Sequence, residues 1–143
     1  MSKAVVKMVI NASANEIWKI ISAFEGVERF APWVASSSVE GLGVGAKRTI
    51  TMKDGVQLFE RLEHLDEQEK ILCYSITDAI SDSPLPVKDF MATVQLQEIS
   101  GNWCEVEWSA TFEAQEKPEA EIIAEMEGML SLAIKELEKL HGG

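Results

Sequence analysis

The chain is poor in the residues that build disulfide-rich or metal-centred proteins. Its two cysteines, Cys73 and Cys104, form neither a disulfide framework nor a CxxC motif. His64 and His141 show no metal-ligand spacing to another histidine or cysteine, so we predict no metal and no other cofactor. With few thiols and no visible signal peptide, we expect a cytoplasmic protein with reduced cysteines.

Basic residues are also scarce, since 13 lysines and arginines stand against 24 aspartates and glutamates and leave a net charge of −11. A nucleic-acid-binding surface needs a basic footprint, so this class of partner is excluded, and adsorption to an anionic membrane is disfavoured for the same reason. No apolar run approaches the ~18 residues of a membrane span, so we expect no membrane insertion. Solubility is the simplest explanation of the acidity.

Apolar residues are plentiful and regularly spaced. They make up 46% of the 143 residues, which predicts one globular domain over residues 1–143 with a sizeable core. Residues 4–10 are rich in β-branched side chains and predict a strand. Ser13 and Glu16 then form a capping-box pattern in front of a helix that Gly26 ends.

The middle of the chain reads as strands separated by turns. Residues 27–34 predict a second short helix, which Pro32 keeps brief. Residues 78–88 contain two prolines and predict a loop. Alternating apolar and polar side chains predict strands at residues 36–40, 47–53, 56–62, 71–77, 89–99 and 103–114.

Two charged residues fall on the apolar face of the predicted hairpin 47–62. A three-residue loop, Lys53-Asp54-Gly55, would place Met52 opposite Val56, because glycine suits its last, left-handed position. In that register Arg48 and Glu60 are inward-facing cross-strand partners.

Tyr74 shares a face with Leu72 on the next strand. If Leu72 lies opposite Leu62, Tyr74 lies opposite Glu60, and a polar row of Arg48, Glu60 and Tyr74 crosses an otherwise apolar wall.

The last segment predicts a long amphipathic helix of about 22 residues after Pro118, because apolar residues recur every three or four positions. The resulting fold class is α+β, a helix-grip fold. A curved antiparallel β-sheet of six to seven strands wraps the long C-terminal α-helix, with two short helices between strands 1 and 2.

The order and spacing of these segments resemble those of the START-like, or Bet v 1-like, superfamily (SRPBCC). Within it they resemble the bacterial polyketide cyclase/dehydrase and lipid-transport family. The resemblance implies a cavity between sheet and C-terminal helix. It is carried by NASANEIWKIISAFEGVERFAPWV, GVGAKR, FERLEHLD, LCYSI, PLPV and VEWSATF.

Plant abscisic-acid receptors are more distantly similar. Their resemblance implies that Glu60 faces the cavity and that the loops around Lys53-Asp54-Gly55 and Pro84-Leu85-Pro86 form its gate. The lysine that holds the hormone's carboxylate in those receptors falls near Ala35 or Ser36, where this chain has none. Hormone-like recognition is therefore not expected.

Three roles are open for Arg48 and Glu60, because a charge on an inner face is costly unless it is paired. In the first, the two residues form a structural ion pair that closes the sheet. In the second, a bulge turns one of them out to solvent. In the third, the pair orients a ligand or takes part in catalysis. For the apolar candidates ordinary core packing is the alternative to cavity lining. The predicted ligand-binding residues are Trp33, Arg48, Met52, Glu60, Tyr74, Leu85, Phe90, Trp108, Met126, Met129 and Leu130.

Two functions compete on this evidence. The first is non-enzymatic binding or carriage of a hydrophobic or amphipathic small molecule, by a monomer or homodimer. The second is a polyketide cyclase/aromatase or dehydratase, in which Glu60 or Tyr74 does acid–base work and Arg48 stabilises an enolate. A third class is an interaction protein with a closed cavity and a dimer contact through Trp103 and Phe59.

Overall fold

Seven antiparallel strands form one curved sheet, in the order β1-β7-β6-β5-β4-β3-β2. The computed structural model describes residues 1–140; His141 and the C-terminal Gly142-Gly143 lie outside them. The strands are β1 (Ser2–Ile10), β2 (Val34–Glu40), β3 (Lys47–Met52), β4 (Gln57–Asp66), β5 (Ile71–Ile80), β6 (Val87–Ser100) and β7 (Trp103–Ala114). The helices are α1 (Ala14–Ser22), a 3-10 turn η1 (Val27–Arg29) and α2 (Glu119–Leu140).

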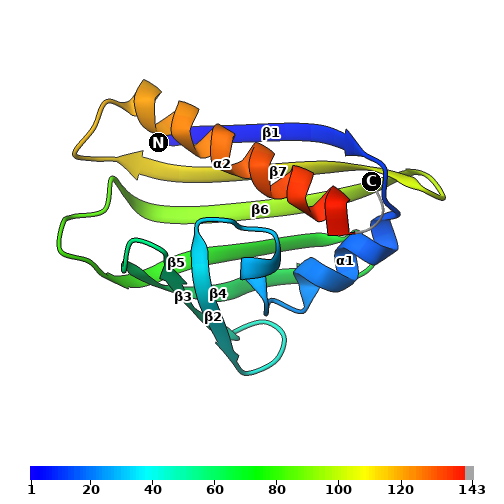
Figure 1. Ribbon diagram of the computed structural model, residues 1–143, viewed down its shortest axis with the longest axis horizontal. Coiled ribbons are helices and arrows are strands. Elements are labelled where there is room, and N and C mark those ends of the chain that lie inside the picture. Colours follow the sequence, from blue (N-terminus) through cyan, green and yellow to red (C-terminus); the bar gives the residue numbers. More distant parts are fainter. Residues whose placement is uncertain (141–143) are drawn as a thin grey trace.

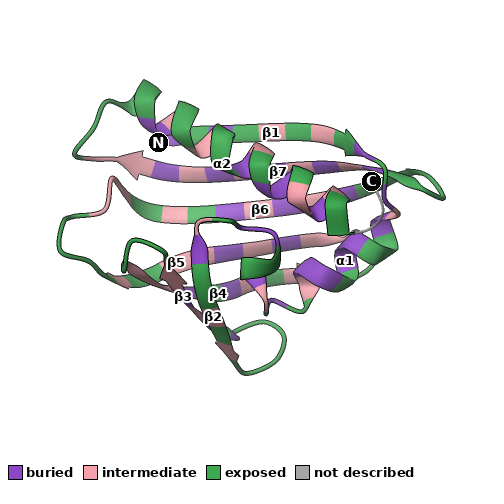
Figure 2. Ribbon diagram, viewed as in Figure 1, coloured by how far each residue is buried: buried purple, intermediate pink, exposed green. Residues whose placement is uncertain are grey.

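The long helix α2 crosses the concave side of the sheet, and α1 lies near its C-terminal end (Figure 1). This arrangement confirms the predicted helix-grip fold. Strand alternation explains the layering: Cys104, Val106, Trp108, Ala110 and Phe112 of β7 are all buried, while the residues between them are partly exposed. Figure 2 shows the same division, with buried segments on the strands beneath α2 and on α1.

The N-terminal helix begins where the sequence predicts. The Ser13 hydroxyl accepts a hydrogen bond from the Glu16 backbone N–H at 3.1 Å and so caps α1. The second helix, expected over residues 27–34, is shorter than predicted and reduces to the turn Val27–Arg29. Pro32 cannot continue a helix, and β2 already begins at Val34.

The C-terminal half of α2 holds most of the residues that the helix buries. Leu130, Ala133, Ile134 and Leu137 are buried there, whereas the N-terminal half has one buried residue, Ile122. Two carboxylates of α2 also bind backbone N–H groups along the edge strand β1 and just after it. Glu127 accepts from Val5 at 3.4 Å, and Glu138 accepts from Asn11 at 2.6 Å.

Within residues 1–140, none of the helices has the length and apolar character required to cross a membrane.

Candidate functional site

A cavity of about 690 Å³ lies between α2 and the concave face of the sheet. This volume falls within the usual range for small-molecule sites. All eleven residues that the sequence nominates as ligand-binding line this cavity. The cavity brings them together from five strands, two loops and α2. That they contact a ligand stays a prediction.

The mouth of the cavity is built from loops. Residues 54–56 of the β3–β4 turn, residues 81–86 of the β5–β6 loop and the first turns of α2 all line it. Figure 1 shows these three segments at the same end of the molecule, opposite α1. The opposite end is tied by Trp18 of α1, whose indole N–H donates to Glu67 in the β4–β5 turn at 2.5 Å.

The β3–β4 hairpin has the predicted register. The Met52 N–H donates to the Val56 carbonyl at 2.8 Å, and the Gly55 N–H donates to the Met52 carbonyl at 3.0 Å. Gly55 has a φ of 94°, a conformation that glycine adopts without strain. Arg48 and Glu60 are therefore direct cross-strand partners, as the sequence predicts.

Arg48 and Glu60 form a buried ion pair, with only 6% and 5% of their surfaces exposed. Nε and Nη2 of Arg48 both contact Oε1 of Glu60, at 2.8 Å and 2.6 Å. The alternative in which a bulge turns one of them out to solvent is therefore wrong.

The guanidinium of Arg48 is held on further sides. Its Nη1 donates to the Phe24 carbonyl at 3.3 Å, and its central carbon lies 3.9 Å from the Phe24 ring centroid and 5.0 Å from that of Tyr74. Sequence reasoning did not nominate Phe24 for this site. Its φ of 65°, rare for a side-chain-bearing residue, accompanies this contact and has no signature in the sequence.

Burial dominates the electrostatics of the pair. It raises the pKa of the Glu60 carboxyl, and the charge and hydrogen bonds of Arg48 oppose that rise. The same burial raises the pKa of the Tyr74 hydroxyl, and the charge of Glu60 raises it further, while Arg48 and Trp108 act in the opposite direction. Tyr74 therefore stays protonated at neutral pH.

Tyr74 faces inward as predicted, but its register was predicted wrongly. The structure pairs Tyr74 with Leu62 and places Ile76, not Tyr74, opposite Glu60. β4 continues to Asp66, which pairs with Ile71, so the turn between β4 and β5 is shorter than the prediction assumed. The register shift at Leu62/His64 then places Tyr74 opposite Leu62 and not Glu63. Tyr74 reaches Arg48 diagonally, and its ring lies 6.2 Å from Phe24 and 6.3 Å from Phe90.

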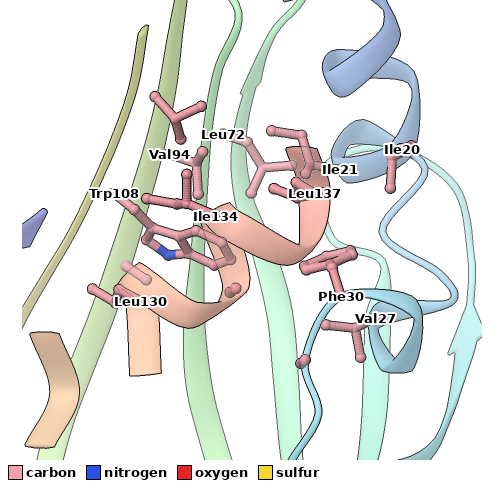
Figure 3. Close-up of a cluster of buried hydrophobic side chains, with 14 of the residues drawn as sticks. Ile20, Ile21, Val27, Phe30, Leu72, Val94, Trp108, Leu130, Ile134 and Leu137 are labelled. Atoms are coloured by element: carbon pink, nitrogen blue, oxygen red, sulfur yellow. The ribbon is translucent and has the colours of Figure 1, made fainter. Parts of the chain in front are cut away.

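Trp108 forms part of the cavity wall from β7. Its ring lies 6.3 Å from Phe30, and Figure 3 shows it reaching towards Leu130 and Ile134 of α2. Cys104 on the same face is fully buried, and burial raises the pKa of its thiol to about 11, which suits an unreactive packed side chain. Within residues 1–140, no group of three histidine, cysteine, aspartate or glutamate side chains is placed to hold a metal ion.

Comparison with known proteins assigns the family. Residues 1–141 match the family described as polyketide cyclase/dehydrase and lipid transport. The chain belongs to this family. The match confirms the resemblance seen in the sequence, and the family's two descriptions, cyclase or dehydrase and lipid transport, correspond to the two functions that the sequence left open.

Solved structures support the same assignment. The protein XoxI from Bacillus cereus is 30% identical with a TM-score of 0.86, covering 99% of this chain and 96% of that one. A protein from Bacillus thuringiensis is 28% identical with a TM-score of 0.84, covering 97% and 98%. Norcoclaurine synthase from Thalictrum flavum, in complex with dopamine and hydroxybenzaldehyde, shares the fold at 17% identity, a TM-score of 0.75 and coverage of 97% and 85%.

Proposed function

We propose that this protein binds or carries a hydrophobic or amphipathic small molecule in the cavity between the sheet and α2. The observation that carries the proposal is the cavity itself, of about 690 Å³ with an apolar wall and a loop-lined mouth. A protein interior of ordinary density leaves few voids larger than a water molecule, so a space of this size calls for a function.

The wall supplies affinity and the polar groups supply orientation. Met126 and Met129 of α2 and Phe90 of β6 present apolar surface, and methionine adapts its shape to different ligands. Tyr74 and the Arg48–Glu60 pair are polar groups in this apolar wall, where they would orient the polar atoms of a ligand. Cys73 and Cys104 are free thiols, which fits a reducing compartment such as the cytoplasm.

One observation favours a second candidate, an enzyme of the cyclase/aromatase or dehydratase type. Burial raises the pKa of Glu60, which favours the protonated carboxyl group that a general acid needs. Arg48 would then stabilise an enolate, with Tyr74 as a proton donor. An enzyme of this kind would convert a bound carbonyl compound, whereas a carrier would release it unchanged.

The test combines native mass spectrometry with titration of Nile red, an uncharged apolar dye. We expect a co-purifying small molecule that is released on denaturation, and the same spectra report whether the chain is a monomer or a homodimer. Met126→Trp should weaken dye binding about tenfold, because the larger ring occupies part of the cavity.

Leu132→Trp is the matched control, since Leu132 lies on the same helix but is 42% exposed. Equal dye affinity in the wild type and both variants would contradict the proposal. If incubation converts the co-purified molecule into a product in the wild type but not in Glu60→Gln, the enzyme replaces the carrier as the better description.

A further inference from the structure

The indole N–H of Trp108 is an unpaired hydrogen-bond donor. Only 7% of the Trp108 surface is exposed, and its Nε1 is the one enclosed side-chain nitrogen or oxygen in residues 1–140 without a hydrogen-bond partner. An unsatisfied buried donor costs about 1–3 kcal/mol. Such groups are rare in folded proteins and call for a specific explanation.

The Tyr74 hydroxyl is a polar neighbour of this donor. On β6, Ala92 pairs with Tyr74 on one side and with Ala110 on the other, while Trp108 pairs with Val94. Both residues on this path are alanines, whose side chains are small. The indole lies near enough to lower the pKa of Tyr74, yet it makes no hydrogen bond of acceptable geometry.

The two groups differ in access. Trp108 Nε1 is enclosed, so a ligand cannot touch it directly. Tyr74, in contrast, lines the cavity. An indole N–H only donates, whereas a phenol both donates and accepts. The chemistry therefore allows one order: indole to phenol oxygen, then phenol hydrogen to the ligand.

We propose that Trp108 and Tyr74 form a donor relay that selects uncharged ligands carrying a hydrogen-bond acceptor, with a ketone or ester carbonyl as the fitting group. Trp108 donates to Tyr74, and Tyr74 donates to the carbonyl oxygen, with no proton transferred. Trp108 is thus a positioning residue that acts through Tyr74. The inference rests on the proposed binding function and names its ligand class.

The charges around the cavity explain why the ligand is uncharged. Arg48 is the only cation among the described lining residues, and Glu60 already neutralises it. Asp54, Asp82 and Glu125 stand at the mouth. An anionic headgroup would pass these carboxylates and then meet no free cation, so a neutral acceptor is favoured.

Two ligands of the same carbon skeleton test the relay: 2-acetylnaphthalene, which has a carbonyl, and 2-ethylnaphthalene, which has none. Competition with Nile red gives their affinities. Tyr74→Phe should weaken binding of the ketone about tenfold and of the hydrocarbon less than twofold, because one hydrogen bond is lost. Trp108→Phe should weaken the ketone about threefold, and Trp103→Phe, altered at an exposed position on β7, should change neither.

Indole resonances give a second readout, which a purely structural role would not move. The chain has four tryptophans, so four indole N–H signals are expected in a ¹H–¹⁵N spectrum, and Trp108→Phe identifies one of them by its loss. The ketone should shift that signal downfield, and the shift should vanish in Tyr74→Phe. The hydrocarbon should leave it nearly unchanged.

The outcomes separate the two proposals. If both ligands bind but Tyr74→Phe and Trp108→Phe weaken them equally, or not at all, the relay is overturned while cavity binding stands. If neither naphthalene nor Nile red binds the folded wild type, the binding function itself fails. Selective loss of ketone affinity together with the selective indole shift supports the relay.

Discussion

Glu60 and Glu63 lie three residues apart on β4, and each is hydrogen-bonded to an arginine, yet their pKa values shift in opposite directions. The Glu60 side chain is 6% exposed and its pKa is raised, chiefly by burial. The Glu63 side chain is 26% exposed and its pKa is lowered, chiefly by its hydrogen bond to Arg61, with a further contribution from Ser75. The contacts are alike, at 2.6 Å and 2.9 Å.

The difference shows that the direction of the pKa shift depends more on which face of the strand the carboxylate occupies than on its arginine partner. Water stabilises the charge on Glu63, so its arginine adds a favourable interaction at small cost. Glu60 has lost that water, and Arg48 offsets only part of the loss. An identical pair of residues is thus a surface feature on one side of the sheet and a candidate functional group on the other.

Removing the buried arginine should have the largest effect. Arg48→Met leaves Glu60 in the cavity wall without a counter-charge, and we expect the free energy of unfolding to fall by about 3–5 kcal/mol. Urea denaturation followed by circular dichroism measures it. The double variant Arg48→Met/Glu60→Leu should recover most of the loss, because no charge then remains buried. A single variant as stable as the wild type would show that the pair does not matter to folding.

The pH dependence of stability tests whether burial outweighs the arginine at Glu60. Because the pKa of Glu60 is raised, the folded state keeps this proton at pH values where the unfolded state has released it. The stability that this proton contributes is fully present at pH values below 4.5, the ordinary pKa of the carboxyl group. It is lost as the pH rises through the pKa of Glu60 in the folded state.

The measured quantity is the free energy of unfolding of the wild type minus that of the double variant, since both contain the other titrating groups. This difference should fall with rising pH, by at most about 1.4 kcal/mol per pH unit. A difference that increases with pH would mean that Arg48 outweighs burial.

The smallest effect is expected on the outer face. Arg61→Met should leave the unfolding midpoint nearly unchanged, because exposed ion pairs contribute little. The pKa of Glu63 should nevertheless rise towards its ordinary value, since its main stabilising hydrogen bond is gone. Carboxyl titration by NMR detects this change, and an unaltered Glu63 would contradict the assigned cause.

The inner hairpin was predictable because its register follows from local chemistry. The glycine at position 55 sets the loop, the loop sets the pairing, and Arg48 and Glu60 follow. The pairing of Tyr74 was not predictable, because the alternation does not reveal that β4 continues to Asp66 or that the register shifts at Leu62/His64.

Other features of the site depend on distant contacts. The Phe24 carbonyl reaches Arg48 only once α1 has docked on the sheet, and the sequence shows only an apolar residue there. The unpaired N–H of Trp108 likewise depends on angles between side chains from different strands. Sequence patterns indicate which face a residue occupies, whereas hydrogen-bond satisfaction is a property of the assembled structure.

The two carboxylates that α2 sets against β1 also bear on whether another strand can add to this edge of the sheet. A strand at the margin of a sheet offers unpaired backbone groups on which a foreign strand can add, which is a common start of aggregation. Glu127 and Glu138 already engage the N–H groups of Val5 and Asn11 along that margin. An incoming strand would have to displace both, so the helix that covers the cavity also protects the β1 edge of the sheet from strand addition.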